Sequence, residues 1–257
     1  RNYLIYEYID SIEIPLYKKA FLYEDTLKNV INKFTSQNIP ITFLAKESLI
    51  DTHKSYEEFY SRLKKHMENN TSNIYYLNQI KKINKALDFL KSDFLNIKHS
   101  SSLIFSHADA GIHNCIYGKK NSLYLVDFEY AGLDSPVKLH IDYLIHPRNV
   151  IYTDKSFKWT EFFYEYLISK EDLKNIHIYN SFFALKWSLI VLNEFLSENW
   201  KYRINADSSR KFRDDIIKEN QLRKSELYLK ACYRTYEKIQ PQLLFTESER
   251  ILLSKSY

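Results

Sequence analysis

The sequence has 257 residues, of which 45% are hydrophobic and 27% charged, as expected for a protein with a substantial buried core. Its 37 Lys and Arg exceed its 32 Asp and Glu by 37 − 32 = 5, and the basic residues alternate with acids, which argues against nucleic-acid binding. No apolar run approaches the roughly 20 residues of a membrane span, so no membrane partner is expected.

The glycine, proline and cysteine contents narrow the expected fold class and location of the protein further. Only three Gly and five Pro favour helices over a loop-rich β fold. Cys115 and Cys232 have no nearby cysteine partner, which predicts free thiols and a cytoplasmic location. The sequence opens at Arg1 and its only methionine is Met67, so we expect the natural start of the protein to lie upstream.

The first predicted elements are one strand and three helices. The run NYLIYEYID (2–10) is short, apolar and rich in β-prone residues, which predicts a strand. Three helices follow, at 16–37, 55–68 and 73–95. In the last of them the apolar residues recur at spacings of three and four, and either Asn73 or Ser72 could supply its N-cap.

From about residue 102 the hydrophobic period becomes that of strands. SLIF, CIY and SLYLVDF predict three short strands, and GKKNS predicts the turn that joins the last two into a hairpin. Further helices are predicted at 135–147, 156–169, 172–199 and 207–238. One more short helix is expected in the tail after Pro241. The predicted fold class is therefore α+β, mostly helical, with one small polar β-hairpin.

Polar side chains concentrate in the stretch SHADAGIHNCIYGKKNSLYLVDFEYAG (106–132). His107, Asp109 and Asn114 lie in the loop before the CIY strand, and Asp127 ends the next strand. Because a hairpin returns the chain to its start, Asn114 and Asp127 should be adjacent. Amide and carboxylate oxygens suit Mg²⁺, and Asp109 remains as a separate carboxylate that can accept the proton of a hydroxyl.

Turn chemistry alone could explain each of these residues. Asp and Asn favour turns and caps, and His107 could be a hydrogen-bonded core histidine. The joint pattern His-x-Asp-x4-Asn with a second Asp thirteen residues later is much rarer, and should arise by chance in roughly two chains per thousand of this composition. The joint pattern therefore favours a magnesium-dependent phosphoryl-transfer site.

The motif HADAGIHN followed by LYLVDFE resembles the catalytic loop and metal-binding segment of the aminoglycoside phosphotransferase and choline kinase-like family, relatives of the protein kinases. DFEYAG is most similar to the choline/ethanolamine kinase side, and LIYEYID resembles the strand and hinge between the two kinase lobes. The stretch after the motif, with LKWSLIVLNEFL, also resembles uncharacterised bacterial phosphotransferase-domain proteins. The resemblance covers residues 3–200 and implies a kinase-like C-terminal lobe.

The resemblance implies roles for the polar residues of the hairpin. Asp109 would be the catalytic base, with His107 as a structural support of the catalytic loop. Asn114 and Asp127 would be the Mg²⁺ ligands. Glu129 is left open: it would reach a second metal ion, directly or through water, or would be a surface strand residue.

The resemblance also implies an ATP site and a division of the chain. Backbone groups of Glu7 and Ile9 would meet the adenine edge, and Ile116 would form part of the apolar floor beneath the base. The expected domains are a hinge strand at 1–12, a helical C-terminal lobe at 13–240 with the catalytic hairpin at 102–130, and a tail at 241–257.

The sequence departs from the family pattern at three points. Ala108 stands where the family usually has Gly. Gly111 occupies a position where the family often has His, and His113, which directly precedes Asn114, is assigned no catalytic role. Neither a Gly-rich phosphate loop nor a Lys-bearing strand precedes the hinge, so we expect that the nucleotide lobe is not present in this chain and that the chain alone is inactive.

Acceptor specificity in such folds comes from the helices after the metal segment, here 136–238. Lys186 and Asn193 share one face of a predicted helix, near Trp187; Lys186 could hold an anionic substrate or simply cover the edge of a core helix. The predicted function is ATP-dependent phosphorylation of a small-molecule hydroxyl, such as that of a sugar or amino alcohol. The alternative is a non-catalytic kinase-like protein that binds a ligand or partner.

Overall fold

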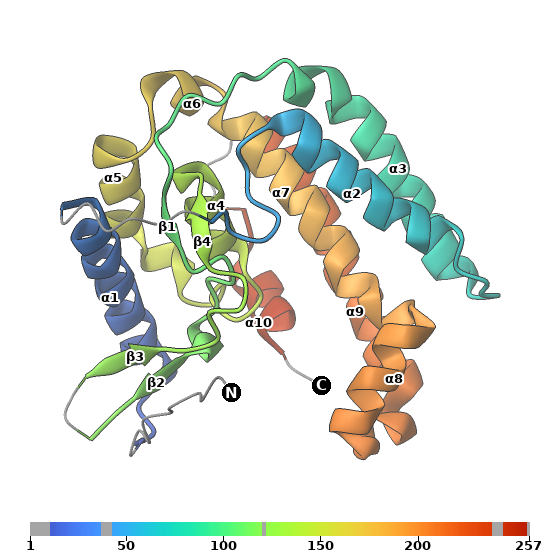
Figure 1. Ribbon diagram of the computed structural model, residues 1–257. Helices are drawn as coiled ribbons and strands as arrows, with labels where there is room; N and C mark the ends of the chain where they lie inside the picture. Colours follow the sequence, from blue (N-terminus) through green and yellow to red (C-terminus); the bar gives the residue numbers. More distant parts are fainter. Residues whose placement is uncertain (1–10, 37–42, 120–121, 238–243, 256–257) are drawn as a thin grey trace, which may run out of the picture.

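Helices make up most of the chain in the computed structural model, which describes residues 11–36, 43–119, 122–237 and 244–255 (Figure 1). The first helices are α1 (Leu16–Ser36), α2 (Thr52–Met67), α3 (Ile74–Leu95), α4 (Pro136–Ile145) and α5 (Phe157–Tyr166). The later ones are α6 (Lys170–Lys174), α7 (Ile176–Ile190), α8 (Ser197–Ala206), α9 (Asp214–Tyr236) and α10 (Glu247–Ser254). The strand predicted at 2–10, with Glu7 and Ile9, lies outside the described residues.

The early helices lie where their sequence patterns predict them. Asn73 caps α3, since its side-chain oxygen accepts a hydrogen bond from the Tyr76 N–H at 3.0 Å. Helix α2 begins three residues earlier than predicted because Asp51 provides its N-cap. The short helix predicted in the tail is also present, as α10, and opens with a capping box at Thr246 and Glu249.

The helix predicted at 172–199 is wrong, because the structure breaks it into three α-helices and a 3-10 turn. Asn175 separates α6 from α7, and the chain tightens into a 3-10 segment over Val191–Phe195 before α8. Tertiary contacts hold this tightened turn: Asn193 Oδ1 lies 3.3 Å from His66 Nε2, and Glu194 binds Arg203. Local periodicity carries no information about these partners.

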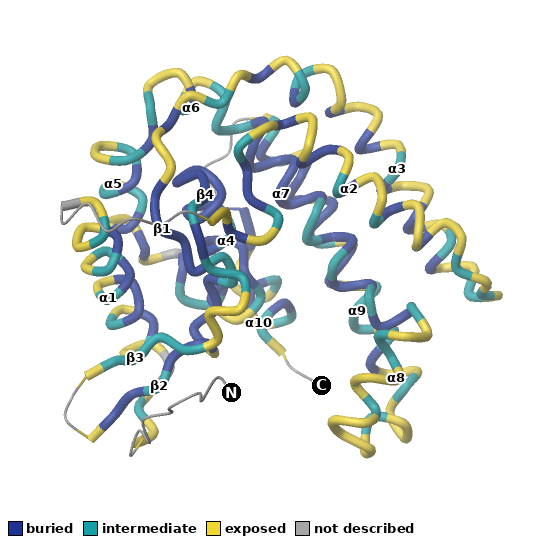
Figure 2. Tube along the Cα trace, viewed as in Figure 1, coloured by how far each residue is buried: buried dark blue, intermediate teal, exposed yellow. Residues whose placement is uncertain are grey.

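The centre of the molecule is α7, which is buried on most of its surface (Figure 2). It packs against α9 and α3, as its almost continuously apolar sequence indicates. The closest aromatic contact is the stack of Phe182 on Phe94, with ring centroids 3.7 Å apart. Among the described residues, no helix is long and apolar enough to cross a bilayer.

Within the described residues, four short strands form two antiparallel pairs, so the mostly helical α+β expectation is confirmed. Strands β2 (Cys115–Tyr117) and β3 (Leu123–Leu125) form the predicted hairpin, with Cys115 opposite Leu125. Strand β1 (Ile104–Ser106) pairs instead with β4 (Gly132–Asp134), which was not predicted. The β1–β4 pairing joins the two ends of the polar stretch and closes it into a loop.

The segment before α2 is fastened to β4 through Gly132. Leu44 forms a parallel bridge with Leu133, and a Cβ atom at Gly132 would lie 2.5 Å from the Ala45 nitrogen. Only glycine permits this approach. The contact holds residues 43–47 beside the polar stretch, with consequences for the candidate site.

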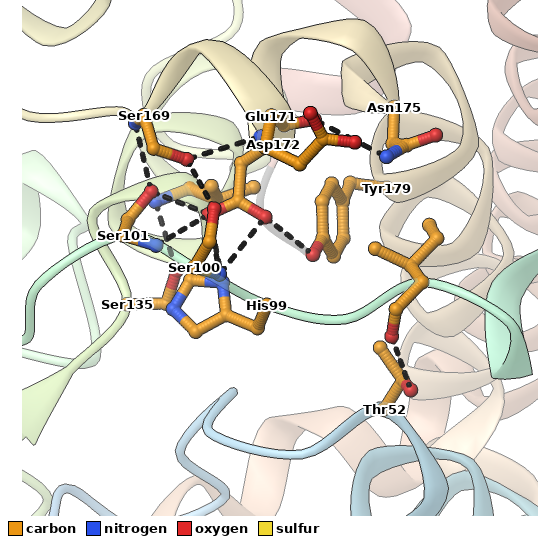
Figure 3. A network of polar contacts seen from close by, with 12 residues as sticks. Thr52, His99, Ser100, Ser101, Ser135, Ser169, Glu171, Asp172, Asn175 and Tyr179 are labelled. Atoms are coloured by element: carbon orange, nitrogen blue, oxygen red, sulfur yellow. Dashed lines mark hydrogen bonds and ion pairs between the residues drawn. The ribbon is translucent and has the colours of Figure 1, made fainter.

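A buried polar network fastens the segment before β1 to α6 and α7 (Figure 3). The Asp172 carboxylate accepts hydrogen bonds from the Ser101 N–H at 2.7 Å, the Ser100 N–H at 3.1 Å and the Tyr179 hydroxyl at 3.0 Å. His99 Nδ1 lies 3.1 Å from the same carboxylate. The Ser101 hydroxyl donates to Asp172 and not to His99, so this trio is a structural anchor and not a nucleophile triad.

Candidate functional site

The loop between β1 and β2 carries the first predicted site residues. His107 is fully buried, with Nδ1 2.8 Å from the Asp109 carbonyl oxygen and Nε2 2.7 Å from the Val126 carbonyl oxygen. The ring therefore bridges the loop to the end of the hairpin. This placement suits a support of the loop, and His107 does not line the neighbouring cavity.

Two residues around this loop have backbone conformations that are unusual for non-glycine residues. Ala108 has φ 66° and Asp127 has φ 64°, both in the left-handed region. The resemblance described above has Gly at the position of Ala108, and the positive φ gives a physical reason for that preference. Strained backbone of this kind concentrates at functional sites, where the surrounding structure maintains it.

Asp109 is placed on the wall of a cavity of about 400 Å³, with its side chain one-third exposed. Its Oδ1 lies 3.3 Å from His146 Nε2. The Arg148 N–H donates to His146 Nδ1 at 3.0 Å, so a neutral ring carries its proton on Nε2 and donates it to Asp109. Burial acts to raise the pKa of Asp109, but the contact with His146 outweighs it and holds the pKa well below its usual range.

His113, which sequence reasoning left without a role, lies on the other oxygen of the same carboxylate. Its Nε2 is 3.9 Å from Asp109 Oδ2, and its ring stacks on His146 with centroids 5.4 Å apart. A Cβ atom at Gly111 would lie 2.3 Å from the His113 ring, so the glycine that departs from the family pattern is what admits this histidine pair. Burial, with a contribution from His146, lowers the pKa of His113 to about 4.

Asp109, His113 and His146 could also be considered as a metal-ligand cluster. One ligand atom from each lies within 4.8 Å of the others. The Arg148 N–H at His146 Nδ1 argues against this, because it leaves the proton on the nitrogen that would have to bind the metal. We therefore interpret the trio as a hydrogen-bonded carboxylate and not as a metal centre.

The two predicted Mg²⁺ ligands approach one another through the hairpin. The Asn114 side-chain amide donates to the Asp109 carbonyl oxygen at 3.1 Å, which leaves its amide oxygen as an acceptor. The Asn114 carbonyl accepts a hydrogen bond from the Val126 N–H at 3.0 Å, and Asp127 is the next residue, exposed. Hard oxygen donors in this position fit Mg²⁺.

The remaining predicted site residues are less informative. Glu129 is exposed in the turn between β3 and β4, which leaves both of its expected roles open. Ile116 is half-buried in β2, opposite Tyr124. The placement of Ile116 beneath the adenine base stays a prediction.

The Asp109 cavity is built from segments that are far apart in the sequence. It is lined by Lys46, Glu47, Arg62, Ala108, Asp109, Ala110, Tyr130, Lys138, Asp142, His146, Lys186, Trp187 and Ile190. Four of these side chains are basic and three are acidic. The cavity is therefore strongly polar, with its charges mostly paired.

One charged group of the cavity wall centres on Glu47. Its carboxylate contacts Arg62 and lies 2.7 Å from the Lys186 ammonium, and its backbone φ of 56° is also left-handed. Burial acts to raise the pKa of Glu47, but Lys186 and Arg62 outweigh it and hold the pKa at about 2. Lys186 is thus at the cavity, as the sequence allowed, whereas Glu47 and Arg62 belong to no recognisable motif.

The other charged group centres on the buried Lys138 ammonium, 3.0 Å from Asp134 and 3.3 Å from Asp142. Burial acts to lower the pKa of Lys138, but Asp134 and Asp142 raise it above its ordinary value. Asp134 also accepts the Leu49 N–H at 2.7 Å, and Trp187 Nε1 lies 3.3 Å from Asp142. These contacts tie β4, α4 and α7 together at the cavity.

Comparisons with known proteins give likenesses to solved structures alone. No protein-family model matches the sequence, and no curated protein matches it significantly. Among solved structures, choline kinase LicA from Streptococcus pneumoniae resembles the chain with a TM-score of 0.48 and 16% identity. The alignment covers 89% of this chain and 73% of the other. A likeness at this level assigns no activity, so function is inferred from the side chains of the site.

Proposed function

We propose that the protein is a kinase-like phosphotransferase that transfers a phosphoryl group from ATP to the hydroxyl of a small molecule. The observation that carries the proposal is Asp109, a partly exposed carboxylate at the wall of a small-molecule-sized cavity, oriented by His146. A carboxylate so placed can accept the hydrogen bond of an acceptor hydroxyl and then its proton.

The Mg²⁺ that accompanies ATP would neutralise charge on the phosphate oxygens. Asn114, through its amide oxygen, and Asp127 would hold it, because both offer hard oxygen donors at the same end of the hairpin. Glu129 is a candidate for a second ion. His107 would keep the loop that carries Asp109 in place.

His146 and His113 act through Asp109 and are positioning residues. The His146 N–H, fixed by the backbone of Arg148, holds one carboxylate oxygen in a defined orientation. The low pKa of Asp109 that results keeps the carboxylate ionised at neutral pH, which is the state that can accept a proton.

The cavity chemistry favours a polar, hydroxyl-bearing acceptor. Paired charges such as Glu47 with Lys186 and Asp142 with Lys138 offer donors and acceptors to hydroxyl groups. A sugar or an amino alcohol fits this lining. A quaternary ammonium group would face Lys46, Arg62 and Lys186 on the same wall.

The test is a screen of hydroxyl-bearing metabolites for ADP release by the full-length gene product, followed by Asp109→Asn. We expect this variant to lose roughly 10²- to 10⁴-fold in kcat, because the amide cannot accept the proton. Asp88→Asn, on the exposed face of α3, is the matched control. Unchanged turnover in Asp109→Asn would remove Asp109 as the base. If the protein binds a ligand but releases no ADP with any metabolite, the result would instead favour the non-catalytic alternative.

A further inference from the structure

A second cavity, of about 210 Å³, adjoins the Asp109 cavity. His146, Trp187 and Ile190 line both. The rest of the second cavity comes from His113, the loop after α4, the 3-10 segment after α7, helices α8 and α9, the 3-10 segment Ser208–Arg213 between them, and the end of α10. It shares part of its wall with the candidate catalytic site.

The second cavity is strongly cationic. Its basic residues are Arg148, Arg203, Arg210, Lys224 and Lys255. Among the described residues, Glu194 is the single acidic one that lines it, so basic side chains exceed acidic ones by 5 − 1 = 4. By contrast, basic residues exceed acidic ones by 4 − 3 = 1 in the Asp109 cavity. An imbalance of this size produces a positive potential in a confined space.

The nearby acids are already engaged. Glu194 Oε1 lies 3.2 Å from Arg203 Nε and 3.4 Å from an Arg210 nitrogen, while its buried Oε2 makes no hydrogen bond within the described residues. Asp207, outside the lining, lies 3.8 Å from Arg210. Counting Asp207 still leaves an excess of 5 − 2 = 3 basic side chains.

One cation of the cavity is held away from bulk water. Lys224 is 5% exposed, and its ammonium donates a hydrogen bond to the Lys255 carbonyl oxygen. Burial, with a contribution from Arg148, lowers the pKa of Lys224 to about 8. Confining like charges costs free energy, and an anion in the cavity would offset that cost.

We propose that this cavity binds a phosphate group. Arginine forks bind phosphate oxygens in pairs, and a dianion matches the excess of positive charge. The volume is below the roughly 300 Å³ at which pockets take drug-sized ligands, so it admits a phosphate with a short stem. Because the two cavities share a wall, the phosphate is either part of an acceptor whose hydroxyl reaches Asp109 or free inorganic phosphate.

The test is a calorimetric titration of tag-free full-length protein with inorganic phosphate at constant ionic strength, without nucleotide. Wild type should bind phosphate at one site, and Arg148→Gln and Arg203→Gln should each weaken binding by about tenfold or more. Arg223→Gln is the matched control on α9, since Arg223 pairs with Glu219 and does not line the cavity. Phosphate affinity that is absent in wild type, or equal in all four proteins, overturns the proposal.

The two sources of the phosphate are distinguished in the ATP-turnover assay, with hexose phosphates compared with the parent hexoses. If Arg148→Gln raises KM for the phosphorylated acceptor alone, the cavity holds the acceptor's own phosphate. If Arg148→Gln loses phosphate binding and leaves acceptor KM unchanged, the ligand is free phosphate. The calorimetric result does not depend on turnover, so failure of the proposed kinase activity leaves the phosphate site separately testable.

Discussion

Asp109 and Asp172 are two carboxylates with similar partners and different surroundings. Each lies within 3.3 Å of a histidine nitrogen, and in each case interactions with donors lower the pKa against the effect of burial. Asp172 is completely buried and accepts hydrogen bonds from three other residues, whereas Asp109 is one-third exposed at a cavity. A lowered pKa therefore does not identify a reactive carboxylate; exposure to a cavity distinguishes the two.

The same substitution at both positions tests this comparison most strongly. Asp172→Asn should cost about 3 kcal/mol of unfolding free energy, because an amide NH₂ cannot accept the hydrogen bonds that converge on Asp172. Asp109→Asn should cost about 1 kcal/mol or less, since the amide oxygen can still accept from His146. Urea denaturation of both variants measures the difference, and equal losses would contradict the structural distinction.

A second test separates metal binding from loop structure. Asp127→Ala should weaken Mg²⁺-dependent nucleotide binding by roughly 100-fold, because it removes the proposed charged ligand and leaves the β2–β3 hairpin intact. A Mg²⁺ titration at fixed nucleotide concentration gives the value. Glu129→Ala in parallel shows whether a second ion is bound. An unaltered Mg²⁺ titration for Asp127→Ala would show that this carboxylate is not a ligand.

A third test of how burial acts on a titratable group concerns a histidine that has no hydrogen-bond partner among the described residues. His140 is fully buried, neither ring nitrogen makes a hydrogen bond within the described residues, and burial lowers its pKa to about 3. Below about pH 6.5 the unfolded chain binds a proton at His140, whereas the folded chain does not. The free energy of unfolding therefore has its full value above that pH and declines as the pH falls toward 3. Between pH 6.5 and 5 the loss is about 2 kcal/mol.

His140→Phe should remove that dependence. The urea midpoints of wild type and variant should diverge between pH 7 and 5, with the variant less sensitive to acid. His53→Phe is the control, because His53 is exposed on α2. Identical pH dependence in wild type and His140→Phe would show that His140 binds its proton equally well in the folded and the unfolded chain, and would contradict the lowered pKa.

The local parts of the fold could be predicted from the sequence. The β2–β3 hairpin follows from two short apolar runs and a turn between them, and α3 follows from its stripe and the cap at Asn73. Strand β4 could not be predicted, because it has three residues and its partner β1 precedes the whole hairpin. The break after Ile190 depends on contacts of Asn193 and Glu194 with distant side chains.

The candidate site likewise contains residues that the local sequence identifies and residues that only tertiary contacts bring to the cavity. His107, Asp109 and Asn114 were identified because they stand close together in one motif, and the structure places them in one loop; their chemical roles remain predictions. Glu47 and His146 could not be identified, since each reaches the cavity through tertiary contacts that no spacing encodes. Charge partners that are distant in sequence leave no periodic signal.

The bridge between Leu44 and Leu133 also has a consequence for the order of folding. Strands β2 and β3 are joined by a short turn, so the hairpin can close rapidly. Leu44 and Leu133 are far apart in the chain, and their contact requires closure of a long loop. Glu47 reaches the cavity only once that contact exists. The loop that carries Asp109 can therefore form early, while the wall of the Asp109 cavity is completed among the last long-range contacts.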